Sequence, residues 1–119
     1  MKVVIDPAID KDAEISDRVR RANLYLEPRL GEFKDHVEAK WSTPLEHRDQ
    51  LELTLRFTDD VPVEASDRFP ADVLRPDRYP GLWLGGVINA LFGRRVDVHL
   101  SRVRRMLREL EHEESVNGA

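Results

Sequence analysis

The sequence predicts an α+β fold, in which a small, mostly antiparallel sheet is covered on one face by a long kinked amphipathic helix and a C-terminal helix pair. Three observations predict it. Apolar residues recur at steps of three or four from Ile15 to Trp41, which is the spacing of one helix face. Apolar and polar residues alternate from Leu51 to Thr58, as in a half-buried strand. The segment 81–92 is almost wholly apolar, and its length and the following Gly93 favour a buried helix.

Composition limits the classes of protein to consider. The 119 residues suit one domain, which we expect over residues 1–114, with a frayed tail over residues 115–119. The chain has no cysteine, which excludes disulfides, thiolate nucleophiles and thiolate metal sites and is compatible with the cytoplasmic location that we expect. The first ten residues contain no apolar run long enough for a signal peptide. The longest apolar run, residues 81–92, is shorter than a membrane span of about 20 residues.

The N-terminal elements are expected to be a strand and the long helix. Lys2–Asp6 contains three consecutive apolar residues before Pro7, which predicts a short strand buried on both faces. Asp10 or Asp12 is expected to cap the helix that follows, because a carboxylate can accept its free amide hydrogens. Pro28 interrupts this helix while the apolar spacing continues. The helix therefore either kinks at Pro28 or divides into two helices that share one face.

The central segment is expected to form a hairpin and a long loop. The strand Gln50–Thr58 turns at two aspartates and is paired with Val61–Ala65, which Pro62 confines to a sheet edge. Residues 66–80 contain three prolines and are predicted as a surface loop with one helical turn at Ala71–Leu74. Three apolar anchors are expected to fix this loop to the surface, and a partner-binding loop is the alternative. These anchors are Phe69, Leu74 and Tyr79.

The C-terminal region fits two secondary structures. Val96, Val98 and Leu100 alternate, which favours a short strand, followed by a helix that Ser101 caps. A single helix from Val96 is the alternative, because apolar residues also recur at helical steps as far as Leu110.

Charge is concentrated near the C-terminus. Residues 94–108 carry six arginines against one aspartate, a net charge of +5, and residues 109–114 carry four glutamates. The whole chain has a net charge of −4, which argues against general attraction to nucleic acid or anionic lipid. We interpret the arginines as a solvated helix face, with contacts to an anion or a partner as the alternative. The candidates for such contacts are Arg102, Arg104, Arg105 and Arg108.

No motif predicts catalysis, a metal site or a cofactor. The serines lack the G-x-S-x-G elbow, and neither the P-loop nor the G-x-G-x-x-G pattern is present. Two Glu–His pairs lie at helical spacing, Glu32 with His36 and Glu109 with His112. Only the second has the Glu-x-x-His spacing of a di-iron bundle site, which needs two such pairs. We therefore expect no metal, cofactor or catalytic residue.

The sequence favours a non-catalytic, cytoplasmic protein-interaction module that self-associates, as a dimer. Its apolar helices exceed what one thin sheet can cover, and exposed apolar patches mark interfaces. The expected interface residues are Trp41, Trp83, Leu84, Val87 and Leu91. The first alternative is a small-ligand-binding domain or small enzyme, in which loop 66–80 forms a lid over Tyr79, Trp83, His47 and Arg56. The second is a nucleic-acid-associated factor that uses the arginines of residues 94–108. No membrane partner is expected.

Overall fold

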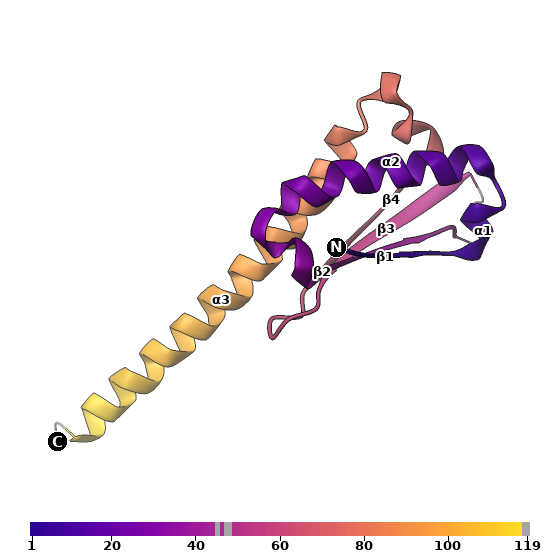
Figure 1. Cartoon of the computed structure of the whole chain (residues 1–119). Helices are drawn as coiled ribbons and strands as arrows, with labels where there is room; N and C mark the ends of the chain where they lie inside the picture. Colours follow the sequence, from indigo (N-terminus) through magenta and orange to yellow (C-terminus); the bar gives the residue numbers. More distant parts are fainter. Residues whose placement is uncertain (45, 47–48, 118–119) are drawn as a thin grey trace.

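The computed structural model describes residues 1–44, 46 and 49–117. These residues form a mixed sheet of four strands in the order β1-β2-β3-β4, in which β1 is parallel to β2 and the other neighbours are antiparallel. The strands are β1 (Lys2–Ile5), β2 (Val37–Ser42), β3 (Gln50–Phe57) and β4 (Glu64–Pro70). The helices are α1 (Pro7–Asp10), α2 (Ala13–Leu30) and α3 (Gly81–Asn117), with 3₁₀ turns η1 (Gly31–His36), η2 (Ala71–Leu74) and η3 (Pro76–Arg78). The α+β fold predicted from the sequence is confirmed (Figure 1).

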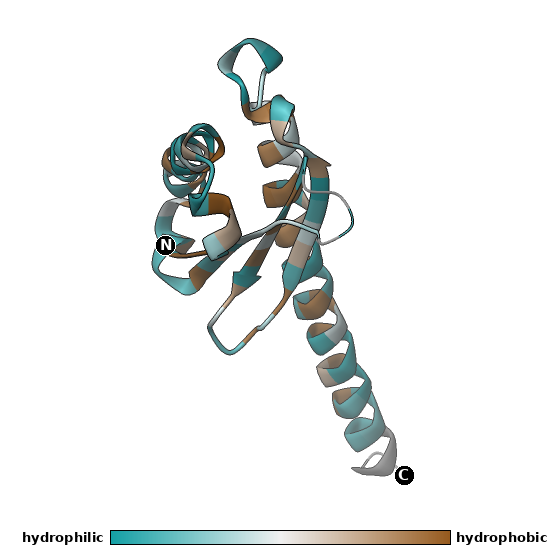
Figure 2. Ribbon diagram, turned by 90° about the vertical axis from the view of Figure 1, so that its right-hand side faces the viewer, coloured by the Kyte–Doolittle hydropathy of each residue, from teal (hydrophilic) through white to brown (hydrophobic). Residues whose placement is uncertain are grey.

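The core lies between one face of the sheet and the two long helices. Strand β3 turns four fully buried side chains to this face, as its alternating pattern predicts; they are Leu51, Leu53, Leu55 and Phe57. Helix α2 packs its apolar stripe on them through Val19, Ala22, Leu26 and Leu30. The first half of α3 completes the cover, and its buried side chains belong to the same core cluster. Figure 2 shows hydrophobic segments of this helix where it runs beside the sheet. Trp41 is fully buried, and its indole nitrogen donates a hydrogen bond to Asn23 Oδ1 over 2.8 Å.

The opposite face of the sheet is polar. Thr54 and Ser66 share a hydrogen bond of 2.8 Å across β3 and β4, and the Arg68 guanidinium donates to Glu52 over 2.5 Å. On β2, Glu38 lies between the side chains of Lys2 and Arg56. Because hydrogen bonds and ion pairs join these side chains, the face needs no second layer of helices.

The long helix predicted from Ile15 to Trp41 is wrong beyond Leu30. Gly31 ends α2 with a backbone φ of 58°, a conformation that glycine adopts without strain, and its amide donates to the Pro28 carbonyl. Pro28 itself stays within the last turn of the helix. Val37 and Trp41 lie in β2, where apolar and polar residues alternate. Residues four positions apart fit the period of two of a strand as well as the spacing of a helix face. Asp12 caps α2 as predicted and accepts the amides of Glu14 and Ile15.

Two further predictions about strands need correction. The strand Lys2–Asp6 is not buried on both faces, because β1 is an edge strand in which Val3 and Val4 are each more than a third exposed. The return strand starts at Glu64 instead of Val61 and continues to Pro70, through the first residues of the predicted loop 66–80. The helical turn at Ala71–Leu74 is confirmed as η2. Phe69 and Leu74 anchor the segment as expected, whereas Tyr79 is 75% exposed.

The predicted C-terminal helix pair is a single helix of 37 residues, α3, and the strand over Val96–Leu100 is wrong. No proline interrupts the chain from Gly81 onwards, and most residues after Gly93 favour helix. Residues 115–117 form its last turn, their fraying stays a prediction, and residues 118–119 lie outside the described part. Beyond the sheet the helix projects freely (Figure 1). The described chain measures 70 × 29 × 22 Å, and its radius of gyration is 19.0 Å, against about 14 Å for a compact chain of this length.

Candidate interaction surface

Helix α3 leaves the domain through a cluster of aromatic and charged side chains. The rings of Phe33, Phe57 and Phe92 contact one another edge to face, with centroids 5.6–5.7 Å apart. The Arg95 guanidinium lies 4.1 Å from the Phe57 ring centre and donates to both carboxylate oxygens of Asp59 over 2.9 and 2.8 Å. We call the Arg95–Asp59 pair the exit clamp, because it fixes α3 to the turn between β3 and β4.

The exit clamp changes the charge properties of both partners. Hydrogen bonding from Arg95 lowers the pKa of Asp59 from its ordinary value of 3.8 to about 2, helped by the Val61 amide. Asp59 in turn raises the pKa of Arg95. Both side chains are mostly covered, with exposed fractions of 18% for Asp59 and 13% for Arg95. The Asp59 carboxylate is therefore held in a structural ion pair with Arg95.

Beyond the exit clamp, α3 carries an apolar stripe that the described residues of the chain leave uncovered. The α3 stripe consists of Val96, Leu100, Val103, Leu107 and Leu110. These side chains follow steps of four, three, four and three, and each is 46–54% exposed. Met106, beside the stripe, is 61% exposed. Figure 2 shows these apolar positions as brown bands between hydrophilic turns of the projecting helix. This spacing is that of a coiled-coil seam.

The arginines singled out in the sequence share this projecting half of α3. Arg102, Arg104, Arg105 and Arg108 are all exposed. Arg102 donates a 3.5 Å hydrogen bond to the Asp60 carbonyl, next to the exit clamp. At about 100° per residue, Arg105 and Arg108 lie on the side of the helix away from the α3 stripe. The apolar and basic surfaces therefore occupy different sides of one helix.

The interface predicted from the sequence requires correction. Trp41, Leu84, Val87 and Leu91 are at most 3% exposed, since they form the core between the sheet and the helices. They cannot meet a second copy unless the domain opens. Trp83 is 41% exposed, and one side of its ring packs near Phe69 at 6.2 Å between centroids. The surplus of apolar surface lies instead on the α3 stripe, which the sequence analysis assigned partly to a strand.

The predicted lid site is not assembled. Trp83 lies in the first turn of α3 and packs near the buried Phe69, and Tyr79 lies between η3 and α3. Arg56 alternates with the buried residues of β3, so it points to the opposite, polar face and pairs with Glu38. His47 lies outside the described residues. The three described members of this site therefore do not converge.

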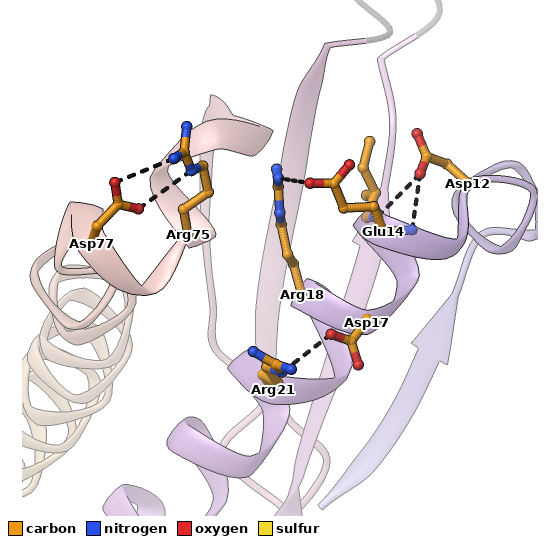
Figure 3. Close-up of polar contacts among 8 residues, drawn as sticks. Asp12, Glu14, Asp17, Arg18, Arg21, Arg75 and Asp77 are labelled. Carbon is orange, nitrogen blue, oxygen red and sulfur yellow. Dashed lines mark hydrogen bonds and ion pairs between the residues drawn. The ribbon is translucent and has the colours of Figure 1, made fainter.

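A second group of charges surrounds the start of α2 (Figure 3). The Asp12 carboxylate is used as a helix cap, Arg18 pairs with Glu14, and Arg21 pairs with Asp17 over 3.1 Å. Arg75 and Asp77 pair separately within the segment that precedes α3. Each carboxylate in this view already has a cation or amide partner. Within the described ranges, no three histidine, aspartate or glutamate side chains are grouped as metal ligands.

Comparison with protein-family models, with curated proteins and with solved structures found no match. Among the helices that the structure describes, none is both long and apolar enough to cross a membrane.

Proposed function

We propose that this protein is a non-catalytic protein-interaction module that associates with a second copy of itself through the α3 stripe. The observation that carries the proposal is the projecting half of α3, with five apolar side chains in coiled-coil spacing that are each about half exposed. We place the module in the cytoplasm, in keeping with a chain that uses no disulfide.

Physical chemistry supports a partner for this helix. An isolated helix shorter than about 12–15 residues is marginal in water, and most helices gain stability by burying an amphipathic face. Residues 96–114 continue α3 without burying such a face against the described part of the chain. A helix that packs along the α3 stripe would remove these side chains from water, at roughly 25 cal/mol for each Å² of apolar surface covered.

The charges on α3 favour a second copy as that partner. The same helix carries a basic block over residues 94–108 and an acidic run over residues 109–114. Two copies can therefore supply both members of an ion pair across one seam, which a partner of a single charge sign cannot do.

Sedimentation of the full chain tests the proposal. We expect the wild type to form a dimer, and the double variant Leu100→Gln with Leu107→Gln to be monomeric with unchanged helix content. The matched control is Arg105→Gln with Arg108→Gln, which changes the other side of the helix and should remain dimeric. A wild-type chain that stays monomeric at high micromolar concentration would contradict the proposal. Salt-sensitive duplex binding that only the arginine control loses would favour the nucleic-acid alternative instead.

A further inference from the structure

We propose that the two copies pair antiparallel, with their α3 helices crossing a two-fold axis between Leu100 and Val103. This inference rests on the proposed self-association and adds the orientation and register of the pair. Because this axis runs across the helices and passes between two seam residues, every contact occurs twice and each side chain of the seam meets a different side chain of the second copy. Three layers result, each present twice. They join Leu100 with Val103, Val96 with Leu107, and Gly93 with Leu110 of the second copy.

The glycines of α3 supply the first argument. The seam continues backwards from Val96 at the same spacing, through Gly93, Asn89 and Gly86. Gly86 and Gly93 are exposed, and no atom lies within 4 Å of the position that a Cβ would occupy. Nothing within the described chain packs on these two positions. Each weakens the helix relative to alanine.

An antiparallel partner provides a reason for Gly93. In the proposed register its open surface lies opposite Leu110 of the second copy, so that a large side chain fills the space beside a small one. A parallel pair in register would instead place Gly93 against Gly93 and Gly86 against Gly86. Those two layers would be empty, and close packing of apolar side chains would be lost there.

The flanking charges supply the second, independent argument. Asp97 and Arg104 each follow a seam residue and lie on the same flank of the helix. In the antiparallel register Asp97 of each copy lies nearest Arg104 of the other, which gives two ion pairs of opposite sign. In a parallel pair Arg104 would face His99 instead, and these two ion pairs would not form. Opposite charges beside the seam are the feature that sets helix orientation in coiled coils.

The surface needed for this pairing is free. On the first half of α3 the buried residues Leu84, Val87 and Leu91 face the sheet, and the exposed residues Gly86, Asn89 and Gly93 face away from it. The C-terminal part of the second copy can therefore lie along the outer side of this half. Each domain then sits at an opposite end of the shared seam, and the two do not compete for space.

Cysteine cross-linking tests the orientation, because the chain has no cysteine of its own. We expect an oxidised equimolar mixture of Val96→Cys and Leu107→Cys to give a disulfide-linked dimer. Neither variant alone should link to itself, since identical positions would be 11 residues apart along the pair, or about 16 Å, whereas a disulfide requires Cα atoms within about 7 Å. Arg105→Cys, on the other side of the helix, is the control and should not link in any mixture.

The outcomes separate this inference from the proposed function. Self-linking of Val96→Cys and of Leu107→Cys alone would show a parallel pair, and would overturn the orientation while leaving self-association intact. A dimer by sedimentation in which no combination links would overturn the register. A monomer by sedimentation would overturn both proposals.

A glycine variant provides a second measurement. Gly93→Leu should leave helix content unlowered in the dilute chain, because the new side chain enters open space and leucine favours helix. It should overfill the layer with Leu110 of the second copy and weaken dimerisation by about tenfold or more. An unchanged dimer dissociation constant for this variant would overturn the assigned layer.

Discussion

The two halves of α3 differ in apolar character and in how much of their apolar surface is buried. The docked half, residues 81–95, buries Leu84, Val87 and Leu91 against the sheet and is held at its end by the exit clamp. The projecting half, residues 96–117, presents a regular stripe of aliphatic side chains to solvent and is charged on its other sides. In this chain, the most apolar segment is therefore the one that is buried most completely in its own domain. The surface left for a partner is the moderately apolar, strongly periodic one.

The largest expected effect is on the free energy of unfolding, when a leucine is truncated in the docked half and in the projecting half. Leu91→Ala should lower the free energy of unfolding by about 3 kcal/mol, because it leaves a cavity among fully buried neighbours. Leu107→Ala removes the same atoms from the α3 stripe and should change the unfolding free energy of the dilute monomer by less than about 0.5 kcal/mol. Urea denaturation at low protein concentration measures both. Equal losses would show that the projecting half is packed within its own chain.

The second effect concerns the exit clamp that joins the halves. Asp59→Asn should destabilise the protein at neutral pH, because it leaves the Arg95 guanidinium without its carboxylate partner. The folded-state pKa of Asp59 lies below the ordinary value of 3.8, so its contribution is complete above that value and is lost as the pH falls toward about 2.

Urea denaturation of wild type and variant at several pH values checks this pattern. The stability difference between them should therefore shrink between pH 4 and pH 2. Asp60→Asn, in the adjacent position, is the control for a charge change in the same turn. A difference that stays constant across this range would exclude the clamp as its source.

The smallest effect compares two glycines of the docked half. Gly85→Ala should raise the free energy of unfolding by up to about 1 kcal/mol, because a Cβ there meets no atom within 4 Å and alanine favours helix. Gly81→Ala should not, since its Cβ would lie 2.6 Å from the Tyr25 hydroxyl oxygen. Thermal denaturation of the two variants in parallel is sufficient. Stabilisation by both would mean that Tyr25 moves aside freely.

Sequence patterns predicted the layers of the fold better than the ends of its elements. The strict alternation of β3 has only one interpretation, and the structure agrees with it. The residues of β2 were assigned to a helix, because Val37 and Trp41 continue the apolar steps of α2 by coincidence. Gly31, whose positive φ ends α2, and the 3₁₀ turn η1 that follows separate the two elements. The segment Val96–Leu100 also fitted two structures, because its alternating valines favour a strand whereas its apolar spacing favours a helix.

The candidate surface was only partly predictable. Surplus apolar surface and self-association were inferred from composition and spacing, but the residues chosen were Trp41 and four from the most apolar segment, and four of the five are core. The spacing from Leu100 to Leu110 was visible and would have identified the α3 stripe. The exit clamp was not visible, since Asp59 and Arg95 are 36 residues apart and no local pattern joins them.

The edges of the sheet bear on how large an assembly this protein can build. Strand β1 offers only four residues, and β4 is charged at Glu64, Asp67 and Arg68 and ends in Pro70. Short, charged and proline-containing borders discourage the addition of further strands. Chains that joined edge to edge could add further copies without limit. Two helices related by a two-fold axis cover each other's apolar faces, so that no third copy is added. Under the proposed self-association through α3, these edges favour a closed pair over a fibre.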